Sequence, residues 1–243
     1  MDRLQRCRAV SKLVDDALRI GCGAVETGNE VSDFELIAKS FEKGVVGEHL
    51  NRRINTLPPN QVLWIVARDR NGIPIGTMAA RYDIVQGWDL AHFIREYWAR
   101  AYTGVGKNPV EIEEESLRYA KGIQGPWVYI GEGFVESEFR NKGISKILIQ
   151  ILILLSFDEY NPSLIYGWMR PNLINRGINT SWGFHNTIYP GVRWMSAPKQ
   201  ADLKDLAFVS CDSAGVDRIA RNKLQNVEDS KTANIQSAQV SHQ

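Results

Sequence analysis

Residues Val135–Ile147 read V-E-S-E-F-R-N-K-G-I-S-K-I, and this stretch decides the fold. An apolar run precedes it and a strongly apolar, helix-like run follows it, so it predicts a strand, a tight basic loop and a helix start. The unpaired N–H groups of a helix N-terminus carry roughly half a positive charge and attract phosphate. Arg140, Lys142 and Lys146 add cationic side chains. Because Gly143 lets the backbone approach a ligand, the pattern favours the phosphate of a nucleotide-like cofactor.

The order and spacing of these residues resemble the acyl-CoA-binding motif of the GNAT superfamily of N-acyltransferases. In that motif an apolar strand is followed by Arg or Gln, two residues, Gly, one residue, and then Gly or Ala at the opening of a helix. Arg140, Gly143 and Ser145 fill the three positions. Ser145 departs from the usual Gly or Ala, but its small side chain still leaves room for a pyrophosphate.

Two further patterns resemble the same family. Asn172 is followed eleven residues later by Gly183-Phe184, as the family often shows across a strand end, a helix and the next strand. A hairpin is predicted over Val62–Ala80 with Asn71-Gly72 in its turn, like the hairpin that precedes the CoA motif. The three patterns follow the family's order over Val62–Phe184, which is about half of the chain.

The resemblance implies an α/β, GNAT-like fold with a mixed, mostly antiparallel, twisted sheet and helices on both faces. We assign residues 1–212 to this domain, with an inserted helical segment at about residues 85–125. Residues 213–243 lack aromatic side chains and are rich in polar ones, so we expect a partly disordered tail. Among the smaller elements, Val45–Ile54 is interpreted as a short helix.

The inserted segment carries an aromatic-rich run, Trp88–Tyr102. A link between a hairpin and a cofactor strand is usually short, so this segment needs an explanation. Its aromatic side chains are interpreted as packing on the body of the domain or against a second subunit. The alternative is a lid or wall of the acceptor site.

Composition excludes several classes of protein. The chain has 243 residues with 29 Lys and Arg against 28 Asp and Glu, which gives no global preference for nucleic acid. Cys7, Cys22 and Cys211 form no C-x-x-C pair and predict neither a disulfide framework nor a metal site. The longest apolar run, Ile147–Leu155, is far shorter than the roughly 20 residues of a membrane span. The charged N-terminus is not followed by the apolar h-region of a signal peptide, so we expect a cytoplasmic protein. The sequence leaves open whether the protein forms a homodimer.

The resemblance implies acetyl-CoA as the acyl donor. An extended pantetheine arm would pair with the backbone of Gly133–Val135. An N–H group near Val135 would stabilise the oxyanion, so Val135 is assigned a catalytic role. The implied cofactor-binding residues are Phe134, Val135, Arg140, Asn141, Lys142, Gly143, Ile144, Ser145, Lys146 and Asn172.

Proton transfer is the point at which the sequence departs from the family. The usual Tyr general acid falls at Asn179, whose amide is not an ionisable proton donor. Ser181, Tyr189 or a water would replace it, or the thiolate would leave unaided, since a thiol with a pKa of about 8.5 is a fair leaving group.

A base must remove a proton from the acceptor amine. Glu132, on the cofactor strand, is the first candidate, with Glu136 and Asp83 as alternatives. His185 is interpreted as a hydrogen-bonded strand residue. Arg170 either binds an acceptor carboxylate or neutralises a neighbour.

The resemblance thus implies transfer of an acetyl group from acetyl-CoA to the amine of a small molecule or amino-acid-like acceptor. One alternative is a longer-chain N-acyltransferase that uses acyl-CoA or acyl carrier protein. A second alternative, suggested by the missing Tyr, is a non-catalytic acyl-CoA-binding module. A tRNA-modifying activity is disfavoured because the chain lacks a basic excess.

Overall fold

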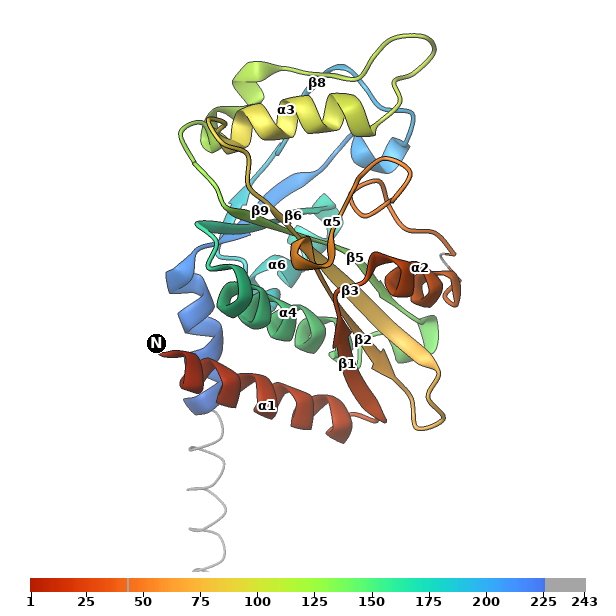
Figure 1. The fold of residues 1–243 in the computed structure, drawn as a ribbon, viewed down its shortest axis with the longest axis vertical. Coiled ribbons are helices and arrows are strands. Elements are labelled where there is room, and N and C mark those ends of the chain that lie inside the picture. Colours follow the sequence, from red (N-terminus) through yellow and green to blue (C-terminus); the bar gives the residue numbers. More distant parts are fainter. Residues whose placement is uncertain (43, 226–243) are drawn as a thin grey trace, which may run out of the picture.

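The computed structural model describes residues 1–42 and 44–225 of the chain. Its main element is a seven-stranded sheet with the order β1-β2-β3-β5-β6-β9-β7 (Figure 1). The strands are, in this order, Ala24–Gly28, Val62–Arg68, Pro74–Asp83, Trp127–Val135, Leu164–Met169, Ala207–Cys211 and Asn186–Ile188. All neighbouring strands are antiparallel except β5 and β6, which are parallel. The sheet is therefore mixed and mostly antiparallel, as predicted.

The helices lie on both faces of this sheet (Figure 1). They are α1 Arg3–Arg19, α2 Val31–Lys39, α3 Leu90–Ala101, α4 Ile144–Tyr160, α5 Pro171–Ile174 and α6 Ile178–Trp182. Residues 213–225 are also helical. A second, two-stranded sheet consists of β4, Glu111–Ile112, and β8, Trp194–Ser196. The fold is thus α/β, with helices on both faces of a mixed sheet.

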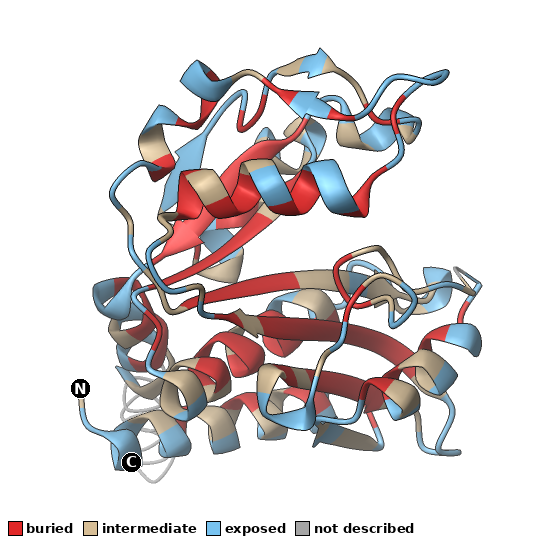
Figure 2. Cartoon of the chain, turned by 45° about the horizontal axis from the view of Figure 1, so that its top comes forward, coloured by how far each residue is buried: buried red, intermediate tan, exposed pale blue. Residues whose placement is uncertain are grey.

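Side chains alternate between the two faces because a strand has a period of two. Val128 and Ile130 of β5 join the core formed with α1 and α4. Trp127 and Tyr129 join a second core that includes the buried side of α3. Figure 2 shows both α3 and the central strands as largely buried where they face each other. The sheet therefore separates an α4 side from an α3 side.

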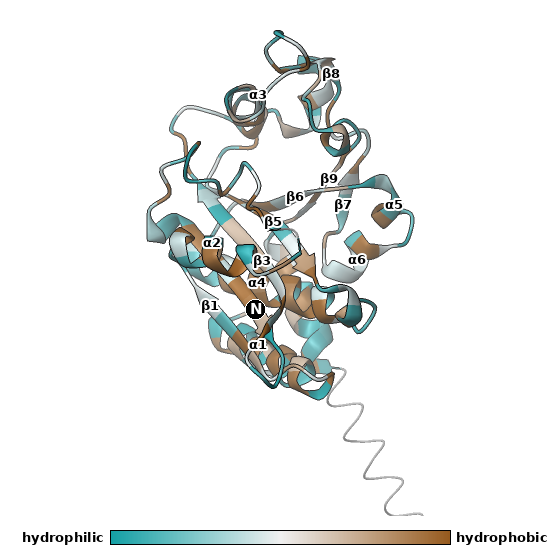
Figure 3. Cartoon of the chain, turned by 90° about the vertical axis from the view of Figure 1, so that its right-hand side faces the viewer, coloured by the Kyte–Doolittle hydropathy of each residue, from teal (hydrophilic) through white to brown (hydrophobic). Residues whose placement is uncertain are grey.

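Helix α4 is the apolar run that follows the basic loop. It is buried nearly all round, which explains why its sequence lacks a polar face (Figure 3). Gly143, with φ of 85°, precedes it, and Asn161, with φ of 43°, ends it, both in the left-handed region. Within residues 1–42 and 44–225, no helix is long and apolar enough to cross a membrane.

The inserted segment at 85–125 forms α3, β4 and the 3-10 helix Glu114–Ala120. Asp89 caps α3 by accepting a hydrogen bond from the His92 N–H at 2.9 Å, and it also accepts one from the Gly122 N–H at 3.0 Å. Trp98, 1% exposed, packs against Trp168 of β6. The segment is thus a packed layer of the domain.

The helix predicted over Val45–Ile54 is wrong, because these residues form turns and a loop. The loop takes its conformation from long-range hydrogen bonds that local sequence does not reveal. The polar tail is helical over residues 213–225, and the disorder expected for the last dozen residues lies outside the described part of the chain.

Candidate active site at the diverging strands

Strands β5 and β6 pair over only three residues each. Tyr129 and Tyr166 form the last pair of the register. Beyond it, β5 continues to Val135 and β6 to Met169 without pairing to each other. The two strands therefore diverge, and the edge of β5 that faces β6 offers backbone N–H and C=O groups to an extended ligand.

A β-bulge lies in the diverging part of β5. Thr77 pairs with Phe134 and Ala79 with Gly131, so three steps on β5 oppose two on β3. Glu132, inside the bulge, has φ of 56°. A residue other than glycine in this region costs of order 1–3 kcal/mol and is typical of functional sites. The bulge therefore redirects Glu132 out of the normal alternation of the strand.

The Glu132 carboxylate is held by the loop that follows α2. Its Oε2 accepts a 2.9 Å hydrogen bond from the Gly47 N–H. A Cβ at position 47 would lie 2.3 Å from Glu132 Oε1, so a larger residue there would displace the carboxylate. Gly47 thus fixes the direction of Glu132, which is the first candidate for the base from the sequence.

A cavity of about 590 Å³ occupies the gap between the strands. Ile149 and Phe184 line it from the α4 side of the sheet, and Trp98 and Tyr102 line it from the α3 side. Glu132, Gly133, Arg170 and Asn172 of the predicted site also line it. The cavity is therefore lined from both faces of the sheet.

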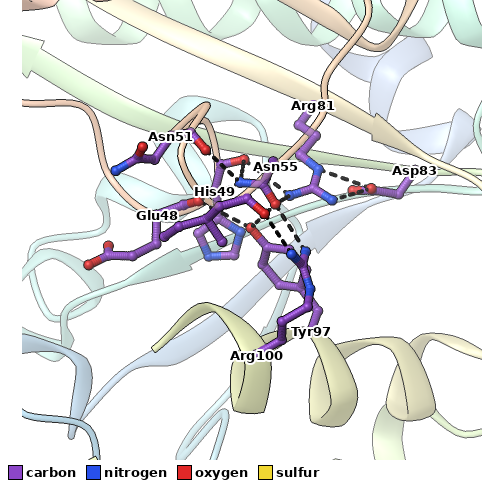
Figure 4. Close-up of polar contacts among 9 residues, drawn as sticks. Glu48, His49, Asn51, Asn55, Arg81, Asp83, Tyr97 and Arg100 are labelled. Carbon is purple, nitrogen blue, oxygen red and sulfur yellow. Dashed lines mark hydrogen bonds and ion pairs between the residues drawn. The ribbon is translucent and has the colours of Figure 1, made fainter. Parts of the chain in front are cut away.

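A buried polar network holds the cavity-lining loop in place (Figure 4). Arg81 donates to Asp83 Oδ1 from Nε at 3.0 Å and from Nη2 at 2.7 Å. Its Nη1 donates to the His49 carbonyl at 3.1 Å and to Asn55 Oδ1 at 3.3 Å. Tyr97 of α3 donates to the same Asn55 oxygen at 3.2 Å. The loop is thereby tied to β3 and to α3.

Asp83, which the sequence offered as an alternative candidate for the base, is part of this network. Asp83 is 8% exposed, forms an ion pair with Arg81 and does not line the cavity. Glu136, the other alternative, follows β5, and its N–H donates to the Ile75 carbonyl at 2.9 Å. Neither carboxylate lies in the cavity lining, whereas Glu132 does.

Three aromatic residues lie together in the cavity lining, and sequence reasoning had singled out neither His49 nor Tyr129. The His49 ring stacks on Tyr129 with 4.1 Å between centroids and lies edge-on to Tyr102. Burial, with a contribution from Arg81, lowers the pKa of His49 to about 3, so it is neutral. Burial raises the pKa of Tyr102 and of Tyr129, and the Glu132 charge adds to both shifts. Both phenols therefore keep their protons, and they are able to act as hydrogen-bond donors but are poor acids.

Asn179 occupies the position of the family's Tyr acid but faces elsewhere. It is 8% exposed, and its Nδ2 donates to Thr187 Oγ1 at 2.8 Å. It does not line the cavity. Asn179 is thus a structural residue that joins α6 to β7.

The loop before α4 leaves its helix N-terminus uncapped by any side chain in the described part of the chain. The first helical hydrogen bond runs from the Ile147 N–H to the Gly143 carbonyl at 3.1 Å. Asn141 and Gly143 both have positive φ, at 62° and 85°. Alternating conformations of this kind form an anion-binding concavity of N–H groups. The loop geometry therefore suits a phosphate group.

The cationic side chains of this loop are positioned by aromatic contacts. Arg140 Nε donates to the Val135 carbonyl at 3.0 Å, and its guanidinium lies 5.8 Å from the Phe134 ring centroid. Lys142 lies over Phe139, with 4.8 Å from Nζ to the ring centroid. The loop thus joins the diverging end of β5 directly to the N-terminus of α4.

A second cavity, of about 610 Å³, opens beside Gly143 and Lys146. His185 lies there, away from the diverging strands, with Nε2 3.4 Å from Asp212 Oδ1. Ser181 lines the same cavity, and its hydroxyl donates to the Ile178 carbonyl. Among the described residues, no cluster of three His, Cys, Asp or Glu side chains is arranged to hold a metal ion.

No protein-family model and no curated protein matches the chain. Among solved structures, Arabidopsis thaliana NAA60 in complex with acetyl-CoA is similar over 79% of this chain and 98% of its own, with 15% identity and a TM-score of 0.42. The Escherichia coli GNAT-family N-acetyltransferase YhbS in complex with CoA covers 79% and 83%, with 16% identity and a TM-score of 0.39.

FeeM, an N-acyl amino acid synthase from uncultured soil microbes, covers 81% of this chain and 92% of its own, with 8% identity and a TM-score of 0.45. These are similarities of fold. The strand order, the diverging parallel pair and the bulged strand before the loop and α4 give this chain an α/β fold with a mixed sheet, which is the fold that the resemblance of its sequence implies.

Proposed function

We propose that the protein transfers an acetyl group from acetyl-CoA to the amine of a small acceptor. The observation that carries the proposal is the continuity between the diverging edge of β5 and the uncapped N-terminus of α4. The pantetheine arm is an extended chain with amides, which fits the open edge of β5. The pyrophosphate fits the N–H groups of the loop and the first turn. One ligand would therefore span both features.

The residues proposed for the cofactor follow from this placement. Phe134 and Val135 present the open strand edge, and Asn172 faces the arm from the start of α5, where it lines the cavity. The loop residues Arg140, Asn141, Lys142, Gly143, Ile144, Ser145 and Lys146 would hold the pyrophosphate. On this basis CoA approaches from the α4 side of the sheet and the amine from the α3 side.

The chemistry requires a neutral amine at the thioester carbon. Glu132, directly or through a water, would accept the ammonium proton, and the amine nitrogen would then form the new C–N bond. A backbone N–H near Val135 would stabilise the oxyanion. The C–S bond breaks next, and the CoA sulfur leaves as a thiolate, which a water then protonates. A hydrogen bond from the Tyr102 or Tyr129 phenol would stabilise the thiolate without transfer of the proton.

The test is calorimetric titration with acetyl-CoA, followed by an assay of thiol release with a panel of amines. We expect saturable binding and amine-dependent release of CoA. Absence of acetyl-CoA binding would overturn the proposal.

The same two measurements decide between the alternative functions. The buried place of Asn179, bonded to Thr187, is the observation that favours a non-catalytic module. Binding without CoA release from any amine would select that module. Release from long-chain acyl-CoA but not from acetyl-CoA would select a longer-chain N-acyltransferase.

A further inference from the structure

Among the described residues that line the cavity, carboxylates outnumber cationic side chains. Its ionisable lining residues include three carboxylates, Glu48, Glu132 and Asp202, and one guanidinium, Arg170. His49 also lines the cavity, but its pKa of about 3 leaves it neutral. Within the described lining there is no lysine. A cation is therefore favoured in the cavity over an anion.

The single arginine of the lining is already engaged. Arg170 Nη2 lies 2.8 Å from Asp202 Oδ2, and the two side chains are 60% and 55% exposed. An acceptor carboxylate would have to compete with Asp202 for this guanidinium. The ion pair matches the second interpretation from the sequence, in which Arg170 neutralises a neighbouring charge.

Glu48 is held so that its carboxylate belongs to the cavity. Its backbone carbonyl accepts from Asn55 Nδ2 at 2.7 Å, while its Oε1 accepts from Gln200 Nε2 at 2.9 Å. Figure 4 shows the Glu48 side chain extending away from the Arg81–Asp83 pair. Arg81, the buried cation of the network, is thus paired with Asp83 and not with Glu48.

The α3 side of the cavity is walled by aromatic rings. Trp98 lies 4.9 Å from Trp168 and 5.1 Å from Tyr102, measured between ring centroids, and all three line the cavity. Aromatic faces bind flat apolar groups and also attract cations. The walls thus suit an aromatic or otherwise flat apolar body attached to an ammonium group.

We infer that the acceptor is a primary amine that carries a flat apolar body and lacks a carboxylate, an arylalkylamine instead of the corresponding amino acid. This inference rests on the proposed function. Glu48 and Glu132 attract the ammonium group, and the rings of Trp98, Tyr102 and Trp168 enclose the body. The carboxylate of an amino acid would face these two glutamates without an unpaired cation in the described lining.

The experiment compares matched acceptor pairs: tyramine with tyrosine, tryptamine with tryptophan, and phenethylamine with phenylalanine. The rate of thiol release from acetyl-CoA gives kcat/KM for each, and mass spectrometry identifies the N-acetyl product. We expect each amine to be favoured at least about tenfold over its amino acid. Tyrosine methyl ester, which keeps the bulk and removes the charge, should approach tyramine. Equal or better use of the amino acids would overturn the inference.

A binding measurement separates this inference from the proposed function. Calorimetric titration of tyramine and tyrosine into the protein saturated with CoA reports acceptor binding without turnover. If tyramine binds more tightly than tyrosine but no acetyl group is transferred, the proposed acetyltransferase activity is refuted and the inferred class of ligand is supported. Transfer to other amines with no preference for tyramine would refute the ligand class alone. If neither compound binds and neither is acetylated, the inference is refuted.

The Glu48→Gln variant tests the source of the preference. Its side chain keeps a hydrogen-bonding oxygen for Gln200 but loses the charge, so the preference for tyramine over tyrosine should fall about tenfold. Glu115→Gln, an exposed residue of the 3-10 helix outside the cavity lining, is the matched control and should retain the wild-type ratio. An unchanged ratio in Glu48→Gln would contradict a role for this charge.

Discussion

The backbone N–H of Gly47 donates a 2.9 Å hydrogen bond to Glu132 Oε2, although 85 positions separate the two residues in the chain. Glu132 lies in a bulge of β5, and Gly47 belongs to the loop that the Arg81 network holds against the sheet. The loop and the bulge together determine the direction of the carboxylate. The proposed base is therefore positioned by tertiary structure, and the predictions below start from this contact.

Replacing Glu132 with Gln should lower kcat by about 10²–10⁴-fold, the usual contribution of a positioned base. The amide oxygen of Gln is still able to accept from Gly47, so the fold and acetyl-CoA binding should be retained. Steady-state kinetics and calorimetry with acetyl-CoA are the measurements. A variant with wild-type kcat would remove Glu132 from the mechanism.

Gly47→Ala should displace the same carboxylate without changing its charge. The new Cβ would lie 2.3 Å from Glu132 Oε1, closer than any real contact, so the side chain must move. We expect a fall in kcat of at least about tenfold with little change in acetyl-CoA affinity. In the double variant with Glu132→Gln the two losses should not add, because both act through one carboxylate. Additive losses would show that Gly47 acts elsewhere.

Ser145→Glu tests the phosphate site with little strain. Position 145 lies in the first turn of α4, where a negative charge stabilises the helix dipole but repels a bound pyrophosphate. Acetyl-CoA should bind at least about tenfold more weakly while the thermal midpoint holds or rises. Ser145→Ala is the control and should bind almost normally. Gly143→Glu is a less clean test, since φ of 85° strains any side chain there.

The elements that could be predicted from the sequence are those with local patterns. The hairpin of β2 and β3, strand β5 and helix α4 follow from alternation, from Asn71-Gly72 and from an apolar run after Gly143. The loop around His49 could not be predicted, because its conformation depends on Arg81, Tyr97 and other residues distant in sequence.

The candidate site also has one part that could be predicted from local sequence and another part that could not. The loop proposed to bind phosphate is contiguous in sequence, so the motif alone was enough to propose it. The α3 side of the cavity combines Glu48, Trp98 and Asp202, which come from three separate segments. Aromatic spacing in α3 indicated packing, and only the tertiary structure shows that Trp98 serves both the core and the cavity wall.

Substitutions at Trp98 and Trp88 of the inserted segment form a test and a matched control for the location of the acceptor site. Trp98 lines the cavity, whereas Trp88 stacks on His92, with 4.2 Å between ring centroids, outside the lining. Trp98→Phe should raise the KM for the amine several-fold, about the effect of losing one aromatic contact of roughly 1 kcal/mol. Trp88→Phe should leave it unchanged, and both should bind acetyl-CoA normally. A larger effect of Trp88→Phe on the amine KM would show that the acceptor lies elsewhere.

His49 should make the protein less stable in acid. Its folded pKa of about 3 lies below the ordinary value of 6.5, because burial and Arg81 disfavour its cation. The unfolded chain therefore binds a proton that the folded chain does not between these two values. The contribution to stability is complete above pH 6.5 and is lost as the pH falls toward 3, by up to about 1.4 kcal/mol per pH unit.

The His49→Phe variant isolates this contribution. Phenylalanine keeps a ring against Tyr129 but does not titrate, so the free energy of unfolding should depend less steeply on pH between 6.5 and 4. Urea denaturation at half-unit pH intervals measures both slopes, and the remaining carboxylates contribute equally to each protein. The wild-type slope should be steeper by up to about one proton. Identical slopes would mean that His49 is accessible to protonation in the folded state, and that the cavity wall is open to water at this ring.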